Sequence, residues 1–173
     1  DKKEIVQADG IILPGVGAFG DAMDILRKQD LLPALRESIN SSKPFLGICL
    51  GMQLLMDESE EFGVHAGLGV FAGKVVQFPH INNTGEPMKV PQVGWNALMR
   101  HGDTWGTSLL DGVENGAQMY FVHSFRVIPA SQDIVVATSV YEGVSYASGI
   151  AKDNITAFQF HPEKSGTGGL QIY

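Results

Sequence analysis

A single cysteine stands where it could act as a nucleophile. Cys49 is the centre of Gly47-Ile48-Cys49-Leu50-Gly51, a G-x-C-x-G pattern between an apolar run and a helical pattern. Two such glycines let a strand turn sharply into a helix and hold the central side chain above the sheet edge, as in G-x-S-x-G hydrolases. The helix N-terminus is expected to lower the pKa of the thiol. The pattern predicts that Cys49 attacks a carbonyl carbon, with the N–H of Leu50 beside the oxyanion.

A histidine and a carboxylate have the spacing of a general base and its orienting group. His161 follows an expected strand over 156–160, and Glu163 comes two residues later, after Pro162. The carboxyl end of a strand delivers side chains into the crevice where α/β folds bind ligands. Glu163 can bond the distal imidazole nitrogen, fix the tautomer and stabilise imidazolium. With Cys49, these residues predict a triad that hydrolyses a small amide.

Each feature also has a purely structural interpretation. A free cysteine is most often a small buried hydrophobe, and an arbitrary H-x-E is most often a strand-end histidine beside a solvated acid. The two patterns in one chain favour the triad. His65, His80 and His101 have no carboxylate partner at a useful spacing and are predicted to lie at the surface. Without a metal-binding histidine pair or a second cysteine, we expect no metal and no cofactor.

A glycine-rich loop over 15–20 offers a competing interpretation. It reads G-x-G-x-x-G between a predicted strand and a predicted helix, which is the fingerprint of a dinucleotide-binding oxidoreductase. That fingerprint also needs an acidic residue at the end of the next strand, and the next strand ends at Cys49 without one. We therefore reject the cofactor and expect the loop to supply a second oxyanion N–H after a peptide flip, which glycine makes easy.

The elements that must position these residues alternate in the first half of the chain and are mostly strands in the second. Predicted strands span 10–13 and 44–48, and predicted helices span 21–26, 32–41 and 50–56. This order indicates a parallel sheet with helices on both faces. Further strands are predicted over 70–78, 89–99, 118–127, 134–142, 145–151 and 155–160, with a tight hairpin over 141–145. The whole predicts one three-layer α/β domain over 1–173 with a mixed sheet.

Composition excludes several classes of protein. The 173 residues carry a net charge of -7, and the 12 Lys and Arg are dispersed along the chain without a basic cluster, so nucleic acid is a poor partner. No run approaches the ~18 apolar residues of a membrane span, and the first residues lack a signal-peptide core. One cysteine excludes an internal disulfide and points to a reducing compartment, so we expect a cytoplasmic protein.

Several motifs together resemble the class I, triad-type glutamine amidotransferases. They are GICLGMQ (47–53), HPEKS (161–165), PGVGAFGDAM (14–23), PQVGWN (91–96) and YFVHSF (120–125), and the resemblance covers essentially the whole chain. It implies a flavodoxin-like fold that hydrolyses glutamine. PGVGAFGDAM, PQVGWN, YFVHSF and the longer run HPEKSGTGGLQIY (161–173) are together similar to the branch that channels ammonia to a (β/α)8-barrel cyclase making imidazole glycerol phosphate in histidine biosynthesis.

The same resemblance assigns roles residue by residue. It implies Cys49 as nucleophile, His161 as acid and base, and Glu163 as its orienting group. Oxyanion N–H groups are implied for Leu50 and Val16. Glutamine contacts are implied for Gly17, Gln53, Glu61, His123, Ser124 and Phe125, and a partner interface for Lys164, Tyr120 and Trp95.

Two further hypotheses share this fold. One is a catalytically silent regulatory scaffold, against which the intact triad argues. The other is a glutaminase feeding a different synthase, against which PQVGWN and YFVHSF argue. Members of the family open with a further strand-helix-strand unit and close with a helix, and we expect this chain to lack both.

Overall fold

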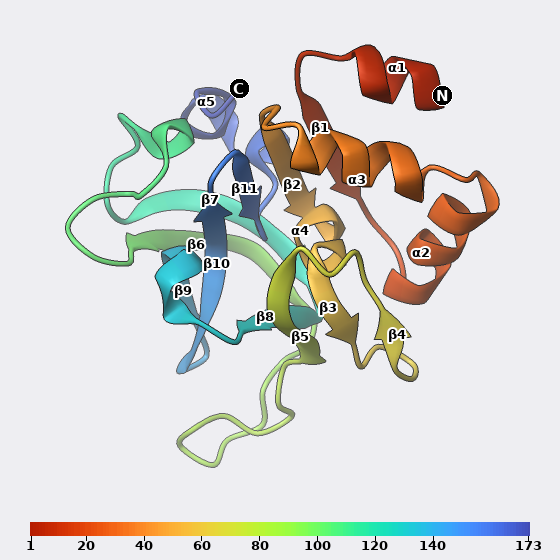
Figure 1. Ribbon diagram of the computed structural model, residues 1–173. Coiled ribbons are helices and arrows are strands. Elements are labelled where there is room, and N and C mark those ends of the chain that lie inside the picture. The colour runs from red at the N-terminus through yellow and green to blue at the C-terminus, as the bar shows by residue number, and fades with distance from the viewer.

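A seven-stranded mixed sheet forms the centre of the computed structural model, which describes residues 1–173 apart from the side chain of Ser108 (Figure 1). Across the sheet the strands follow the order β1 (Ile11–Gly15), β2 (Phe45–Cys49), β11 (Ile155–Phe158), β10 (Val144–Lys152), β9 (Val135–Tyr141), β6 (Gln92–Arg100) and β7 (Ala117–His123). Apart from the one over 118–127, the predicted strands are present with small shifts of their ends. The first three pair in parallel and the others in antiparallel, so the predicted mixed sheet is confirmed.

The parallel strands place two turns side by side. Strand β1 pairs with β2 in a register that puts Gly15 opposite Cys49. Helix α2 (Phe19–Lys28) follows the first turn and helix α4 (Leu50–Leu54) follows the second, with α3 (Leu32–Asn40) between them in the chain. The glycine-rich loop and the cysteine turn therefore meet at one edge of the sheet, as the sequence predicts.

A smaller, four-stranded sheet has the order β4 (His65–Ala66), β3 (Met56–Ser59), β5 (Phe71–Gln77) and β8 (Phe125–Pro129). The predicted single strand over 118–127 is wrong, because the chain leaves the large sheet as β7 and enters the small one as β8. Strands β3 and β4 were not expected either. His65 lies on β4 and is half-buried, so its predicted surface position is only partly right, whereas His80 and His101 are exposed.

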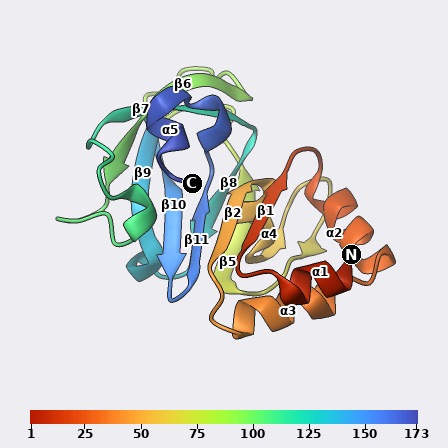
Figure 2. The same ribbon diagram turned by 90° about the horizontal axis from the view of Figure 1, so that it is seen from above.

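The antiparallel half curls away from the parallel strands (Figure 2). Strands β9 and β10 form the predicted hairpin, in which Tyr141 pairs with Val144. Glu142 and Gly143 both have positive φ, of 45° and 81°, as a two-residue turn of this hand requires. The curl brings the end of β7 back to the parallel strands, where the N–H of His161 donates to the carbonyl of Tyr120 at 2.9 Å.

Two apolar clusters pack on the two faces of the large sheet. Phe45 of β2 belongs to a cluster with residues of α2, α3 and α4, and its neighbour Leu46 belongs to a cluster with β6, β7 and β9. The second cluster also takes Trp105 and Leu110 from the segment around the 3₁₀ turn η1 (Ser108–Leu110). That face is thus covered mainly by curled strands and a loop segment, and not by helices as the alternating pattern predicts.

Short helices occur where the sequence predicted none. Helix α1 (Lys2–Gln7) begins with a capping box from Asp1, and helix α5 (Gly166–Leu170) follows the 3₁₀ turn η3 (Pro162–Lys164). A further 3₁₀ turn, η2 (Gln132–Ile134), connects β8 to β9. A short helix therefore does follow the histidine motif. Among the described residues no helix is long and apolar enough to cross a membrane.

Candidate active site

Cys49 lies in a strained turn that its flanking glycines make possible. It ends β2 and caps α4 with φ 53° and ψ -108°, a conformation that costs a non-glycine residue about 1–3 kcal/mol. A Cβ on Gly51 would come within 1.8 Å of the carbonyl oxygen of Leu13. A Cβ on Gly47 would lie 3.0 Å from the carbonyl oxygen of Gly51. The G-x-C-x-G pattern thus reflects close packing of α4 on β1 and β2.

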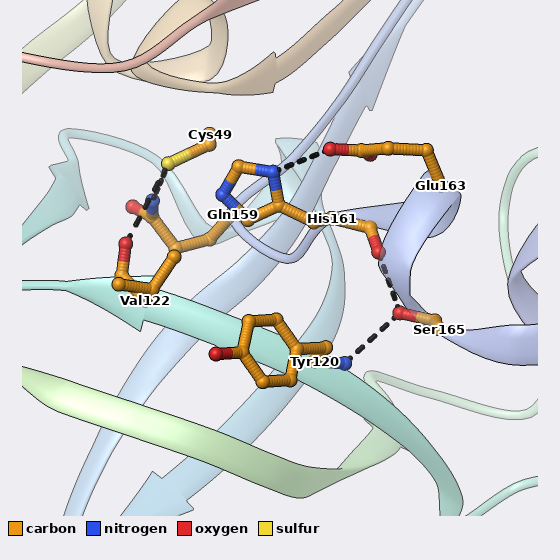
Figure 3. A network of polar contacts seen from close by, with 7 residues as sticks. All are labelled: Cys49, Tyr120, Val122, Gln159, His161, Glu163 and Ser165. Carbon is orange, nitrogen blue, oxygen red and sulfur yellow. Dashed lines mark hydrogen bonds and ion pairs between the residues drawn. The ribbon is translucent and has the colours of Figure 1, made fainter.

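His161 and Glu163 form the predicted pair. The Nδ1 of His161 lies 2.8 Å from Oε1 of Glu163, at the start of η3. The imidazole is 3% exposed, while the Glu163 side chain is 44% exposed and open to solvent. The Nε2 of His161 is buried and has no hydrogen-bond partner among the described residues. In Figure 3 the ring is drawn between the Cys49 sulfur and the Glu163 carboxylate, with this free nitrogen on the Cys49 side.

The backbone of His161 is fixed to the last strand of the sheet. The hydroxyl of Ser165 donates to the carbonyl of His161 at 2.6 Å and accepts the N–H of Tyr120 at 2.9 Å (Figure 3). The N–H of His161 donates in turn to the carbonyl of Tyr120. Three hydrogen bonds therefore hold the backbone of His161 beside Tyr120 in the middle of β7, so the base has little freedom to move away.

The thiol of Cys49 is held in its neutral form. Burial raises the pKa of Cys49 to about 11, and the negative charge of Glu163 contributes in the same direction. The N–H of Leu50, the side chain of Gln159 and the charge of Lys164 lower the pKa, but by less. The prediction that the helix N-terminus lowers this pKa is wrong in sum, because α4 has only 5 residues and desolvation outweighs its N–H groups.

The sulfur has two hydrogen-bond partners in the described residues. The thiol of Cys49 donates to the carbonyl of Val122 over 3.9 Å, and Nε2 of Gln159 donates to the sulfur over 3.7 Å (Figure 3). Neither partner is His161. Gln159 was missed by sequence analysis. The sequence held a signal, since Gln159 lies between two phenylalanines and two residues before His161, and a polar side chain buried in such a segment needs a polar partner.

A cavity of about 240 Å³ opens over the sulfur. Its wall contains Cys49, both residues of the expected oxyanion site and all six residues expected to contact glutamine: Val16, Gly17, Leu50, Gln53, Glu61, His123, Ser124 and Phe125. Val122 completes the wall. A second cavity of about 280 Å³ lies on the other side of Val16 and is lined by His161, Glu163 and Lys164. Val16 is thus the residue that the two cavities share.

Two polar residues of this wall are engaged by the protein itself. Nε2 of Gln53 donates to the carbonyl of Phe125 and to Oε1 of Gln159, each at 3.1 Å. Oε2 of Glu61 accepts the N–H of Phe19, the first residue of α2, at 2.6 Å. Glu61 follows β3 and does not lie on a helix. It therefore anchors the helix that begins where the glycine-rich loop ends.

His123 is a neutral histidine in an aromatic cage. Its Nδ1 lies 2.7 Å from the carbonyl of Phe125, which places the proton on that nitrogen, and its Nε2 is buried without a partner among the described residues. Burial lowers the pKa of His123 to about 4. Phe78, Phe121 and Tyr146 surround the ring with centroids within 5.8 Å. The imidazole is packed among aromatic side chains of the core, and His123 also lines the cavity over the sulfur.

The three expected interface residues lie outside the cavity over the sulfur. Trp95 of β6 is 56% exposed and packs edge-on against Tyr120 of β7, with ring centroids 6.0 Å apart. Val93 is exposed in the same strand, two residues away and hence on the same face. Lys164 is exposed beside the His161 cavity. No cluster of three potential metal ligands occurs in the part of the chain that the structure describes.

Comparison with known proteins gives a family match along nearly the whole chain. The profile described as "Glutamine amidotransferase class-I" matches residues 1–171. Imidazole glycerol phosphate synthase subunit HisH of Geobacillus thermodenitrificans is 51% identical over 172 residues, which are 99% of this chain and 78% of that protein. HisH of Aquifex aeolicus is 44% identical over 172 residues, again 99% of this chain and 78% of that protein.

Solved structures show the same fold at much lower identity. A crystal structure described as a glutamine amidotransferase superposes with a TM-score of 0.70 at 17% identity, covering 99% of this chain and 80% of that one. At this identity the likeness speaks for the fold alone. The expected flavodoxin-like fold of the family, with its curled mixed sheet, is confirmed.

Proposed function

The chain belongs to the class I glutamine amidotransferases, and we propose that it hydrolyses glutamine to glutamate and ammonia in the cavity above Cys49. The observation that carries this proposal is the buried, unpartnered Nε2 of His161, whose other nitrogen is bonded to Glu163. A base with one nitrogen fixed by a carboxylate and the other free is arranged for proton transfer. The strained turn places a sulfur nucleophile within the same site.

The first half of the reaction forms a thioester. Cys49 passes its proton to Nε2 of His161 as the sulfur attacks the side-chain carbonyl carbon of glutamine. The resulting imidazolium is stabilised by the Glu163 carboxylate. His161 then gives that proton to the amide nitrogen, the carbon–nitrogen bond breaks, and ammonia leaves. A thiol with a raised pKa is consistent with this order, because ionisation is then coupled to attack and does not precede it.

The second half returns the enzyme to its starting state. His161 takes a proton from water, and the hydroxide oxygen attacks the thioester carbon. The carbon–sulfur bond breaks, the sulfur takes back the proton from His161, and glutamate is released. Both halves pass through an oxyanion. We assign its N–H donors to Leu50, whose N–H lowers the pKa of the neighbouring Cys49, and to Val16 after a flip of its peptide.

Glutamine is held by the remaining wall of the cavity. Glu61 supplies a carboxylate for the α-ammonium group, and the backbone of 123–125 supplies partners for the α-carboxylate. Both N–H groups of Gln53 are already bonded, so Gln53 offers the substrate its Oε1, which suits the departing amide nitrogen. Gly17 lets the substrate approach the loop backbone, since nothing lies within 4 Å of the position of its missing Cβ.

The relatives named as subunits of imidazole glycerol phosphate synthase suggest where the ammonia goes. We propose that this chain pairs with a cyclase subunit of (β/α)8-barrel fold and supplies its ammonia in histidine biosynthesis, in the cytoplasm. Trp95 and Val93 are exposed, and Tyr120 packs against Trp95, so large apolar side chains gather on this face of β6 and β7 and form a suitable docking surface. Lys164, the third expected interface residue, lines the same cavity as His161 and Glu163 of the triad.

Measuring the glutamate and ammonia released from glutamine tests the proposal directly. The intact chain with its cyclase partner is expected to release equal amounts of glutamate and ammonia. Cys49→Ala is expected to lower the rate by at least about a thousandfold, as loss of a nucleophile does in other acyl-transfer enzymes. Its complex with the partner and its unfolding temperature serve as controls. Turnover near the wild-type rate in Cys49→Ala would refute the assignment.

A further inference from the structure

A buried glutamine lies against the nucleophile and has no role in the reaction described so far. Gln159 is 0% exposed and directly precedes the segment that carries His161. Its Nε2 donates to the Cys49 sulfur over 3.7 Å. We propose that Gln159 is a thiolate-stabilising residue, which holds the sulfur in place and supplies an N–H to the negative charge during both halves of the reaction. The proposal deepens the proposed function and rests on it for the identity of the reaction.

The orientation of the Gln159 amide is determined by its neighbours. A carbonyl can only accept, so the carbonyl of Phe125 requires the nitrogen of Gln53 to face it, at 3.1 Å. The second N–H of the same nitrogen points at the Gln159 side chain, where it requires an oxygen, again at 3.1 Å. The other end of the Gln159 amide, which meets the sulfur, must therefore be its nitrogen. One backbone carbonyl thus fixes two side-chain amides in series.

A donor at this position offsets the burial of the thiol. Hydrogen bonds to charged groups are stronger than neutral ones, and more so where water is excluded. The side chain of Gln159 lowers the pKa of Cys49, against the larger effect of burial. The Leu50 N–H acts in the same direction, but it is also assigned to the substrate oxyanion. Gln159 is fully buried, and among the described residues its Nε2 has only the sulfur as a hydrogen-bond acceptor, so this N–H stays with the sulfur while the Leu50 N–H serves the oxyanion.

The same relay connects the thiol to the substrate cavity. Gln53 and Phe125 line the cavity, whereas Gln159 does not. A substrate glutamine that contacts the 123–125 backbone or the Oε1 of Gln53 therefore touches the same groups that hold Gln53, and Gln53 in turn holds the side-chain amide of Gln159. Gln53 acts as a positioning residue for Gln159 in this arrangement, in addition to its contact with substrate.

The test measures ionisation of the thiol without any glutamine. Cys49 is the only cysteine of the chain, so reaction with iodoacetamide reports on it alone. Gln159→Glu keeps the size of the side chain and an oxygen for Gln53, but turns a carboxylate oxygen toward the sulfur. Gln159→Met removes the donor without adding charge. Between pH 8 and 10 we expect the alkylation rate to fall about tenfold in Gln159→Met, the equivalent of one pKa unit, and further in Gln159→Glu.

A matched control separates this effect from general loss of a buried amide. Gln92 is 2% exposed, and its Oε1 accepts from the hydroxyl of Tyr146 at 2.9 Å, away from the sulfur. Gln92→Met is expected to leave the pH profile of alkylation unchanged. If Gln159 only filled space, the uncharged Gln159→Met would show the wild-type alkylation rate at every pH, and that result would overturn the proposal.

A second readout uses the wild-type chain and needs no variant to fold. The side-chain amide resonances of Gln159 are expected to shift when iodoacetamide caps the sulfur, because the cap removes its acceptor. Resonances that stay in place after complete alkylation would also overturn the proposal. Neither measurement involves turnover, so a chain without glutaminase activity could still support the role of Gln159, and an active chain could still refute it.

Discussion

The chain makes two strand-to-helix turns at the same sheet edge, and they are built in opposite ways. The turn from β2 to α4 is buried, with Cys49 6% exposed and Gly51 pressed against the carbonyl of Leu13. The turn from β1 to α2 lies directly beside it, with Gly15 opposite Cys49. Here Val16 is 74% exposed, and nothing lies within 4 Å of a Cβ built on Gly17. One turn is locked by packing and the other is held mainly at its ends.

This difference separates two requirements of the reaction. A nucleophile must be placed to within a fraction of an ångström, and close packing provides that. A loop that must flip a peptide needs room, which the first turn has. The two turns also explain why the thiol is neutral at rest: its surroundings are dry, and only some of the groups that would stabilise charge are in position.

The largest expected effect comes from adding one methyl group to each turn. Gly51→Ala forces a Cβ toward a backbone oxygen and is expected to cost about 3 kcal/mol or more of the free energy of unfolding. Gly17→Ala meets no atom and pays only for its φ of 97°, about 1–2 kcal/mol. Thermal unfolding of both variants measures the contrast. Equal losses of stability would show that the two turns are not different in packing.

Glutaminase activity tests whether the exposed turn must move. Gly17→Ala is expected to remain folded and to lose activity, because a residue restricted at this position hinders the flip of the neighbouring peptide. The loss should appear in kcat more than in KM, measured by glutamate formation with the partner present. Activity equal to wild type in folded Gly17→Ala would argue that the loop need not move.

The next effect concerns the charge state of the buried turn. Because burial raises the pKa of Cys49 from 9.0 to about 11, the native thiol should react with iodoacetamide along a profile that rises about tenfold per pH unit up to pH 10. The unfolded chain should level off near pH 9. Burial slows the native reaction at all pH values, so the shape of the profile is compared and not the rate. A native profile that levels off at or below pH 9 would favour a thiolate stabilised by the helix, as the sequence predicted.

The smallest expected effect is at the anchor of the exposed turn. Glu61→Gln keeps an acceptor for the N–H of Phe19 but removes the charge, so we expect a loss of about 1 kcal/mol in unfolding free energy. If Glu61 also holds the α-ammonium group of glutamine, KM should rise about tenfold. Asp21 is an exposed residue of helix α2, which begins at Phe19. Asp21→Asn is therefore the matched control for stability and is expected to leave KM unchanged. A normal KM in Glu61→Gln would remove Glu61 from the substrate site.

The sequence predicted the parts of the site that local geometry dictates. The glycines around Cys49 and the spacing of His161 and Glu163 are local features, and the structure brings Glu163 to His161 as expected. The meeting of two parallel turns also follows from strand order. The break at Ser124 could not be predicted, because 118–127 alternates like one strand and only the pairing partners of its halves reveal two sheets.

The sequence could not predict how residues distant in the chain surround the sulfur of Cys49 and change its pKa. The pKa of Cys49 depends on how deeply the sulfur is buried by β7, an element distant in the chain, and the helix dipole alone gives the wrong sign. Gln159 was missed for the same reason, since its partners Gln53 and Cys49 are 106 and 110 residues away. Short elements such as α1, β4 and α5 carry too few residues for a periodic pattern.

The central claim is that the buried turn is complete while the exposed turn waits for a partner. Ammonia release from saturating glutamine, measured for the chain alone and with the cyclase subunit and its ligand, tests it most directly. We predict slow release by the chain alone and a rise of at least about tenfold in the complex, because binding must favour the flipped loop. Equal rates with and without the cyclase would contradict the claim.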